Sequence, residues 1–333
     1  MNKKILVVGS GSIAKRHLDL AKNLVPDAEI KVLSIHRQSE IDSRFLISNE
    51  QDALDFKPSI AVIANPSSMH LSIAKSLAVS GVHLLIEKPI SNDVNGVAEF
   101  VNECKNSKSV LMVGYNLRFS DSLRYFKSEL EKNLIGKPLI VKSEVGSFLP
   151  SWRAEADYKN SVSAKRNLGG GVLLELSHEI DYLEWIFGSI NWARATVMRQ
   201  SSLMIDVEDS AVLTFGIENS HNSNLVANLN MDFIRHDHVR TCLVVGELGS
   251  LKWDGTRQEV SVFEKGATDW TALFTSKKSI ADTYVEEWKD FLHCIETGNS
   301  PRVSGMDGLK TLQVIEAIRL SAPSGQQTMV DRS

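Results

Sequence analysis

Residues 4–14 read KILVVGSGSIA, a short apolar run that leads directly into a glycine-rich turn. The turn, Gly9-Ser10-Gly11-Ser12-Ile13-Ala14, matches the pattern G-x-G-x-x-G/A, and apolar residues recur after it at helical spacing. Its glycines permit a tight turn and a close approach of the backbone to a pyrophosphate, and the free amides at a helix start favour anionic phosphates. The stretch therefore predicts a strand, a turn and a helix that bind a dinucleotide. A glycine turn that only connects strand to helix is the alternative.

Alternating strand and helix signals continue outward from this turn. The predicted strands are Lys4–Val8, Glu29–Ile35, Ser59–Ala64 and His83–Glu87, and helices are predicted from Ser12, over Glu50–Leu54 and from Met69. These strands are continuous apolar runs, which is typical of a parallel sheet covered on both faces. We therefore expect an α/β, doubly wound Rossmann domain over residues 1–118. The pattern changes near Phe119, and a second domain is expected over residues 119–333.

Composition supports two domains and excludes two classes of partner. The 333 residues, 43% hydrophobic and 23% charged, exceed the usual size of one domain. The net charge of −4 and the scattered basic residues argue against nucleic acid, and no apolar stretch approaches the ~18 residues of a membrane span. No signal-peptide pattern precedes the first strand, and Cys104, Cys242 and Cys294 are widely spaced. We expect a cytoplasmic protein whose cysteines are buried and unpaired.

Glu87-Lys88-Pro89 closes the apolar run Val82–Ile86. Ligands of open α/β sheets bind outside the carboxyl ends of the strands, so Lys88 is expected to hold an ammonium beside the nucleotide cleft. Asn65-Pro66 also follows a predicted strand. It is expected to be a cofactor contact or, equally, a plain turn before the next helix.

The end of the second strand addresses the choice of cofactor. An NAD enzyme usually places an acid there for the ribose hydroxyls. Residues 34–39 read SIHRQS and contain no acid, whereas Arg37 and Ser39 suit a 2′-phosphate. NADP is therefore favoured over NAD, with a solvated arginine as the alternative.

Four segments follow one another in a characteristic order: Gly9–Ala14 with His17, Asn65–His70, Glu87–Pro89 and Gly114–Phe119. In this order they resemble the glucose-fructose oxidoreductase/inositol dehydrogenase (Gfo/Idh/MocA) family over essentially the whole chain. The resemblance implies an NAD(P)-dependent oxidoreductase acting on CH–OH groups of sugars or polyols. It adds His70, Glu87 and Asn116 to the expected cofactor residues, Glu87 either orienting Lys88 or contacting the nicotinamide ribose. Arg118 is expected to bind substrate or to form an interdomain ion pair.

The second domain of this family is an α+β domain with an open, mostly antiparallel sheet, and the sequence after Phe119 fits that description. Strands are predicted over Leu139–Val145, Arg194–Arg199, Ser210–Gly216, Leu225–Phe233, Val239–Val245, Ser250–Trp253 and Val260–Glu264. The final helices, about Ile280 to Leu320, are expected to pack back on the first domain. The resemblance further implies a homodimer or homotetramer.

A second chemical segment follows Gly169-Gly170-Gly171. Residues 171–182 are predicted to form one helix whose polar face carries Glu175, His178, Glu179 and Tyr182. The family places an acid and a histidine beside the lysine, and His178 with Asp181 fits the H-x-x-D ending. Relatives have aspartate four residues before the histidine, where this chain has Leu174. We therefore expect a catalytic Lys88–His178 pair, with Glu175 only as a candidate third member.

In the expected reaction His178 accepts the hydroxyl proton and Lys88 stabilises the developing alkoxide. Substrate contacts are expected from Arg118 and Asp181 and from the segment that contains Trp152, Arg153, Lys165 and Arg166. The latter suggests a sugar acid or nucleotide sugar, as in relatives linked to surface-polysaccharide and nonulosonic-acid metabolism. Core packing of Trp152 and simple solvation of the basic residues are the alternatives.

His236-Asp237-His238 offers two imidazoles without a third ligand, so no metal is expected. Two other functions stay open. One is redox-neutral, NAD-dependent glycoside hydrolysis, in which the cofactor returns to its starting state. The other is a non-catalytic dinucleotide sensor.

Overall fold

The computed structural model describes residues 3–34, 41–152, 157–219 and 222–333. The chain divides into two compact units. The first comprises Met1–Tyr115 and Val285–Leu312, and the second comprises Asn116–Tyr284 and Gln313–Ser333. Both boundaries near the C-terminus fall inside long helices.

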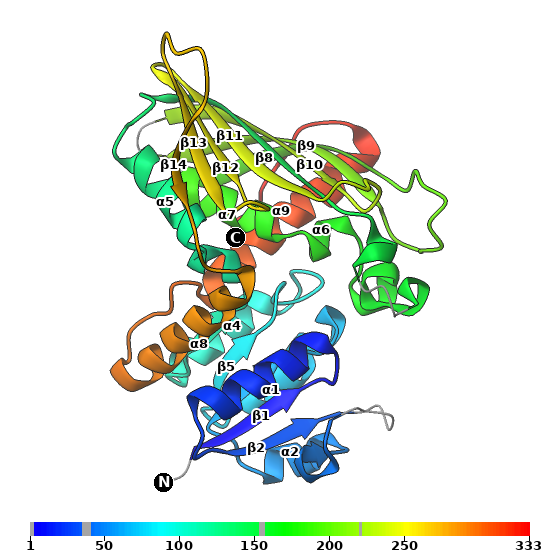
Figure 1. Cartoon of the computed structure of the whole chain (residues 1–333). Coiled ribbons are helices and arrows are strands. Elements are labelled where there is room, and N and C mark those ends of the chain that lie inside the picture. Colours follow the sequence, from blue (N-terminus) through cyan, green and yellow to red (C-terminus); the bar gives the residue numbers. More distant parts are fainter. Residues whose placement is uncertain (1–2, 35–40, 153–156, 220–221) are drawn as a thin grey trace. The chain divides into compact units, whose positions relative to one another are not determined.

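In its described residues the first unit contains a six-stranded sheet in which every paired strand is parallel. Its strands are β1 (Lys4–Val8), β2 (Glu29–Leu33), β3 (Leu46–Ile47), β4 (Ile60–Ile63), β5 (His83–Ile86) and β6 (Leu111–Val113) (Figure 1). The order β3-β2-β1-β4-β5-β6 is that of a doubly wound sheet, with its switch point between β1 and β4. The predicted Rossmann fold is confirmed.

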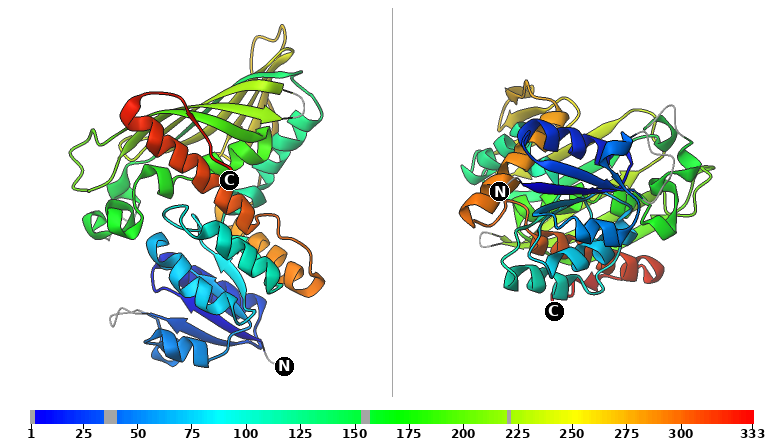
Figure 2. Two further views of the ribbon diagram at one scale, coloured as in Figure 1. Left: turned by 180° about the vertical axis from the view of Figure 1, so that it is seen from behind. Right: turned by 90° about the horizontal axis from the view of Figure 1, so that it is seen from below.

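Helices cover both faces of this sheet. They are α1 (Ser12–Leu24), α2 (Glu50–Asp55), α3 (His70–Ala78), α4 (Val97–Asn106) and the first-unit parts of α8 (Ile280–Thr297) and α9 (Gly305–Ser324). Figure 2 (right) shows α1 and α8 on one face, with α2, α3 and α4 on the other. The central strands are consequently buried on both sides, and Leu6, Val62 and Leu85 are fully inaccessible to solvent. This explains why the strands read as unbroken apolar runs.

The described part of the second unit contains a nine-stranded sheet, ordered β14-β13-β12-β11-β7-β10-β9-β8-β15. Its strands are β7 (Pro138–Gly146), β8 (Ser189–Met198), β9 (Ser210–Asn219), β10 (Asn222–Asp232), β11 (Val239–Gly246), β12 (Gly249–Asp254), β13 (Glu259–Glu264), β14 (Thr271–Thr275) and β15 (Thr328–Met329). The β7–β10 pair is parallel and the other pairs are antiparallel. The expected open, mostly antiparallel sheet is confirmed.

One face of this sheet packs against helices α5 (Asp121–Glu131), α6 (Val172–Glu175), α7 (His178–Phe187) and the end of α9 (Figure 1). Short 3-10 helices complete the two units at Ser43–Phe45, Ser67–Met69, Asn116–Phe119, Leu149–Ser151, Tyr158–Asn160, Val162–Ala164 and Arg166–Leu168. Among the described residues, no helix combines the length and the apolar character needed to cross a bilayer. Cys104, Cys242 and Cys294 are buried and unpaired, as expected.

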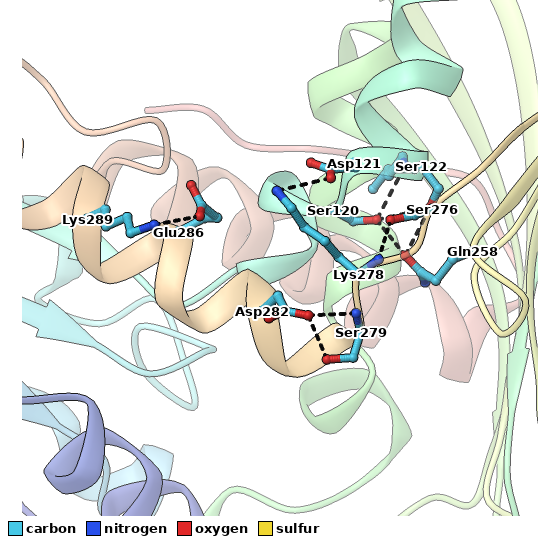
Figure 3. A network of polar contacts seen from close by, with 11 residues as sticks. Ser120, Asp121, Ser122, Gln258, Ser276, Lys278, Ser279, Asp282, Glu286 and Lys289 are labelled. Carbon is cyan, nitrogen blue, oxygen red and sulfur yellow. Dashed lines mark hydrogen bonds and ion pairs between the residues drawn. The ribbon is translucent and has the colours of Figure 1, made fainter. Parts of the chain in front are cut away.

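Polar contacts fix the point at which α8 begins (Figure 3). The Ser279 amide and hydroxyl both donate to Asp282, at 2.7 and 2.9 Å, and Lys278 pairs with Asp121 at 3.2 Å. The hydroxyls of Ser120 and Ser122 each donate to Gln258 Oε1 at 3.0 Å. The chain entering α8 is thereby held against the start of α5.

Candidate functional site

The glycine turn of the first unit is built as an anion-binding helix start. Gly9 has φ 118°, and a Cβ there would lie 2.6 Å from the Ala64 carbonyl oxygen, so the position requires glycine. Around Gly11, by contrast, an added Cβ would meet open space. No side chain caps the first turn of α1, so its amides are available to a phosphate.

Buried Ala14 packs the start of α1 onto the sheet, while Ser10, Ser12 and Ile13 keep partial or full exposure. This is the arrangement that a pyrophosphate needs, with a fixed backbone below and open space above. The turn lies at the switch point, because Gly9 contacts the residue that follows β4.

Asn65 and Pro66 follow β4 at this same edge. Asn65 Oδ1 is buried and has no hydrogen-bond partner within the described residues, and the same holds for Ser68 Oγ. Buried acceptors in native proteins nearly always have partners, so an unpaired one beside the glycine turn suits a bound ligand. The residues present therefore fit a dinucleotide.

His70 holds two loops of this edge together. Its ring nitrogens lie 2.9 Å from the Pro89 carbonyl and 2.8 Å from the Asn65 carbonyl. Burial lowers the pKa of His70 despite these two acceptors, so at neutral pH the ring has one N–H to share between them. His70, expected to bind cofactor, therefore holds the backbone segments at Asn65 and Pro89 in place.

Glu87 and Lys88 leave β5 at the same edge, where the Lys88–Pro89 peptide bond is cis. Glu87 is 7% exposed, and its carboxylate accepts from the Lys88 amide at 3.2 Å and lies 2.8 Å from His17 Nε2. Burial alone would raise the pKa of Glu87, but the hydrogen bond from His17 and the charge of Lys88 hold that pKa below its ordinary value. Lys88 therefore stands next to a fixed negative charge.

In the second unit, three residues that were expected to bind cofactor or substrate have internal partners instead. Asn116 donates to Thr283 at 2.7 Å, and Arg118 forms a two-pronged pair with Asp181 at 2.9 and 2.7 Å. Arg118 and Asp181 are buried. Their pairing with one another ties the segment after Tyr115 to α7.

The prediction of one helix over residues 171–182 was wrong. The structure has two, α6 ending at Glu175 and α7 starting at His178, because Leu176 leaves helical geometry at φ −101° and ψ 22°. The Ser177 hydroxyl closes this break by donating to the Leu174 carbonyl at 2.9 Å. The helical spacing used to place Glu175 on the same face as His178 therefore does not apply.

The four residues predicted to share a polar face also differ in their burial. Glu179 is fully buried against Arg240 at 2.7 Å, and Tyr182 is buried with its hydroxyl 2.5 Å from that of Ser143. Burial, more than any neighbour, raises the pKa of Tyr182 well above its ordinary value. His178 is 9% exposed and Glu175 is half-buried, so these two retain access that Glu179 and Tyr182 lack.

Of the expected substrate residues, Trp152 is half-buried and packs edge-on against Phe233 at 5.1 Å, its indole donating to the Ser147 carbonyl at 3.2 Å. Lys165 is half-buried, and neighbouring Arg166 donates to the Asp206 carbonyl. Arg37, Ser39 and Arg153 lie outside the described residues. Across the described ranges, no group of three or more His, Cys, Asp or Glu side chains could hold a metal ion.

Two buried residues of the first unit, Trp288 and Glu287, were not singled out from the sequence. The indole of Trp288 donates to His17 Nδ1 at 2.8 Å, and the adjacent Glu287 is fully buried. Both come from α8, and Trp288 lies 271 residues after His17 in the sequence. The apolar spacing of Trp288, Phe291 and Cys294 indicates a buried helix face, but nothing in the sequence pairs that face with α1.

Comparison with known proteins decides the family. Residues 3–115 match the model described as "Oxidoreductase family, NAD-binding Rossmann fold", and residues 127–330 match "Oxidoreductase family, C-terminal alpha/beta domain". The chain belongs to the Gfo/Idh/MocA family. The resemblance noted from the four sequence segments is confirmed, and with it an oxidoreductase with a nicotinamide dinucleotide-binding domain.

Relatives within the Gfo/Idh/MocA family are distant but cover the chain. Myo-inositol 2-dehydrogenase of Thermotoga maritima is 24% identical over 93% of this chain and 93% of its own length. A levoglucosan dehydrogenase solved with NADH superposes with a TM-score of 0.87 at 20% identity, covering 100% of both chains. The WlbA dehydrogenase of Bordetella pertussis, solved with NADH and UDP-GlcNAcA, gives 0.83 at 19% identity, again over 100% of both chains. These structural likenesses show the fold.

Proposed function

We propose that this protein transfers a hydride between a nicotinamide cofactor and a carbinol carbon of a sugar, sugar acid or nucleotide sugar. The observation that carries the proposal is the pairing, within one unit, of an uncapped α1 start with a lysine at the end of β5. The first binds the dinucleotide phosphates, and the second places an ammonium on the half of the sheet beyond the switch point. The dehydrogenase relatives support the same reaction class.

The bound nicotinamide supplies a two-electron hydride acceptor, and the remaining steps fall to the protein. As the carbinol C–H bond breaks, the carbon–oxygen bond becomes a carbonyl and the hydroxyl proton must leave. His178 accepts that proton, and Lys88 donates a hydrogen bond to the oxygen while negative charge develops on it. Carbonyl reduction runs the same pair in reverse. Glu175 remains a candidate third member.

Single variants test this assignment. His178→Asn is expected to lower turnover by roughly 10²–10⁴-fold because proton transfer loses its base. Lys88→Ala is expected to lower turnover while dinucleotide binding persists. Turnover is followed at the nicotinamide absorbance band with a panel of polyols, sugar acids and nucleotide sugars. Binding is followed by calorimetry.

Lys105→Ala, on an exposed face of α4, serves as the control lysine and should behave as wild type. Near-normal turnover in both site variants would refute the pair. Substrate consumption without net NAD(P)H would instead indicate redox-neutral glycoside hydrolysis, and dinucleotide binding without any turnover a sensor.

We propose NADP rather than NAD as the preferred cofactor, because residues 34–39 offer Arg37 and Ser39 and no acid. Removing one charged hydrogen-bond donor costs about 1.5–3 kcal/mol, so Arg37→Ala is expected to weaken NADP binding by roughly 10–100-fold and to leave NAD binding unchanged. Calorimetric titrations with both dinucleotides measure this. Tight binding of NAD alone by the wild type would contradict the proposal.

The preferred substrate is proposed to be an acidic sugar or nucleotide sugar, recognised by Lys165 and Arg153, with Trp152 at the edge of the site. The support is the clustering of basic side chains in one segment of the sequence. In the substrate panel, a preference for neutral polyols over their carboxylated analogues would contradict this class.

A further inference from the structure

A chain of buried polar side chains runs from α8 through α1 to the end of β5. Trp288 donates to His17 Nδ1 at 2.8 Å, and His17 Nε2 lies 2.8 Å from Glu87 Oε1. Trp288 and His17 are fully buried. All three residues belong to the first unit.

The donor in this chain fixes the state of the histidine. An indole N–H can only donate, so His17 Nδ1 must present its lone pair to Trp288. The single proton of the neutral ring is then on Nε2 and is donated to Glu87. A second proton, on His17 Nδ1, would point at the indole N–H of Trp288. These two hydrogen bonds therefore hold a neutral His17 imidazole beside an ionised Glu87 carboxylate.

The groups around Glu87 are compatible with a negative charge on its carboxylate. Oε2 accepts from the Lys88 amide, and the Glu87 carboxyl lies against Gly114, where an added Cβ would be 3.2 Å from Oε2. Glu287 on α8 is 0% exposed, and neither of its oxygens has a hydrogen-bond partner among the described residues. Burial, with repulsion from Glu87 and Asp290, raises the pKa of Glu287 well above its ordinary value, which favours the uncharged form of this acid.

The other charged or titratable groups around this centre are accounted for. On α3, His70 faces the Asn65 and Pro89 carbonyls. On α8, Asp290 pairs with Arg302 at 3.1 Å. Within the described ranges, the charges that remain at this centre are therefore the carboxylate of Glu87 and the ammonium of Lys88.

The strand order tells which half of a dinucleotide meets Glu87. The glycine turn follows β1 and belongs to the β1–β3 half, which therefore takes the adenosine side. Glu87 follows β5, in the β4–β6 half that remains for the nicotinamide side. The oxidised nicotinamide ring carries a positive charge and the reduced ring carries none.

We propose that Glu87, held ionised by His17 and Trp288, selects the redox state of the cofactor by binding oxidised nicotinamide more tightly than reduced. This inference rests on the proposed function, since it requires a nicotinamide dinucleotide at this site. His17 and Trp288 are positioning residues that act through Glu87. By linkage, tighter binding of the oxidised form shifts the equilibrium between the bound species toward oxidised cofactor and reduced substrate.

The decisive measurement is the ratio of dissociation constants for the reduced and oxidised forms of whichever dinucleotide the wild type binds. Glu87→Gln keeps the shape and removes the charge, which leaves Lys88 to repel the oxidised ring. The ratio is expected to fall by about 10-fold or more, the effect of one nearby opposite charge. Trp288→Phe removes the indole N–H together with the pyrrole ring that carries it, keeps an aromatic side chain in the core, and is expected to give a smaller fall in the same direction.

Glu287→Gln is the matched control. It makes the same chemical change in an acid that is already uncharged, so the ratio should equal that of the wild type. A fall as large as that of Glu87→Gln would overturn the proposal, and so would an unchanged ratio in Glu87→Gln. If the wild type binds neither form, the proposed function fails and takes the inference with it.

A second readout needs no cofactor and serves if Glu87→Gln does not fold. In protein labelled with ¹⁵N-histidine, with His17 assigned from His17→Gln, the ring is expected to be neutral and protonated on Nε2 at neutral pH. Trp288→Phe should allow the other tautomer or the imidazolium to appear. A His17 ring protonated on Nδ1 in the wild type would contradict the proposed hydrogen bonds from Trp288 through His17 to Glu87.

Discussion

Three buried carboxyl groups show how immediate neighbours decide the state of an acid. Asp181 is held by both arms of Arg118, and Glu179 by Arg240 at 2.7 Å. Among the described residues Glu287 has neither a cation nor a hydrogen-bond donor as a partner, and it is expected to remain protonated. A buried charge is tolerated only with a partner, so the first two are ionised and the third is neutral.

Glu287 makes stability depend on pH. Its pKa is raised in the folded state from the ordinary value of 4.5, so above that pH the unfolded chain releases a proton that the folded protein keeps. Stability contributed by this group therefore falls as pH rises, by roughly 1.4 kcal/mol per pH unit until the folded group titrates. Glu287→Gln removes the dependence. Calorimetric melting should show little change below pH 4.5 and a stabilised variant at pH 7.

The comparison that isolates this effect is Glu286→Gln on the same helix, whose partner Lys289 is exposed at the surface. No growing stabilisation is expected there. If Glu287→Gln melted below the wild type at neutral pH, the acid would have to be ionised and paired.

At the scale of single elements, the start of α1 is specified by two glycines with different duties. Gly9 adopts a left-handed conformation against the Ala64 carbonyl, whereas Gly11 faces open space. The first glycine therefore serves the fold and the second serves the ligand.

Two alanine substitutions separate these duties. Gly9→Ala is expected to destabilise the first unit, because its Cβ would meet the Ala64 carbonyl at 2.6 Å in a backbone conformation that alanine avoids. Gly11→Ala is expected to melt near the wild type yet to bind the dinucleotide more weakly, since a methyl group occupies the approach to the pyrophosphate. Thermal melting and calorimetric titration measure the two effects. Equal loss of stability in both variants would contradict the division.

Local sequence patterns predicted most strands of the first sheet. They failed for elements whose structure depends on contacts with residues distant in the sequence. The strand Lys4–Val8 and the helix from Ser12 agree with β1 and α1 because apolar runs and a glycine turn are local signals. Short β3 and helix α4 went unpredicted, as did β14 and β15 in the second sheet. The α6–α7 break was missed because Leu173, Leu176 and Ile180 keep helical spacing across it.

The candidate site divides in the same way. Lys88 and the Gly9–Ala14 turn could be recognised from the sequence, Lys88 by its place at a strand end and the turn by its motif. The contact between Trp288 and His17, by contrast, joins residues 271 positions apart. No local pattern encodes that contact. An ion pair was one of the two roles expected for Arg118, but its partner Asp181, in the same unit, was not foreseen because Asp181 alone reads as a substrate contact.

At the scale of the whole molecule, the large sheet has one face without helices in the described part of the chain (Figures 1 and 2). Its register aligns a row of positions across neighbouring strands of that face, in which the Trp192 indole covers Gly216: Trp192, Gly216, Val226, Ile140 and Val245. Val212 on the same face is 57% exposed. An apolar row of this kind suits association with another copy of the chain.

We propose that this row forms the contact of a homodimer or homotetramer. Val226→Lys places an ammonium in the middle of the row and is expected to lower the mass measured by size-exclusion chromatography with light scattering. Thr196→Lys, on the same face but off the row, should keep the wild-type mass. A monomeric wild type, or an unchanged mass for Val226→Lys, would contradict the proposal.

The division of the chain has a consequence for how the protein is made. The chain passes from the first unit to the second after Tyr115, returns at Val285 and leaves again after Leu312. A ribosome that has released the glycine turn and Glu87 has yet to synthesise Trp288 and the rest of α8. The first unit therefore finishes folding only after Leu312 has been synthesised, and until Trp288 has emerged His17 lacks the indole that fixes its proton. Assembly of the charged centre therefore waits for a segment made long after the residues that it holds.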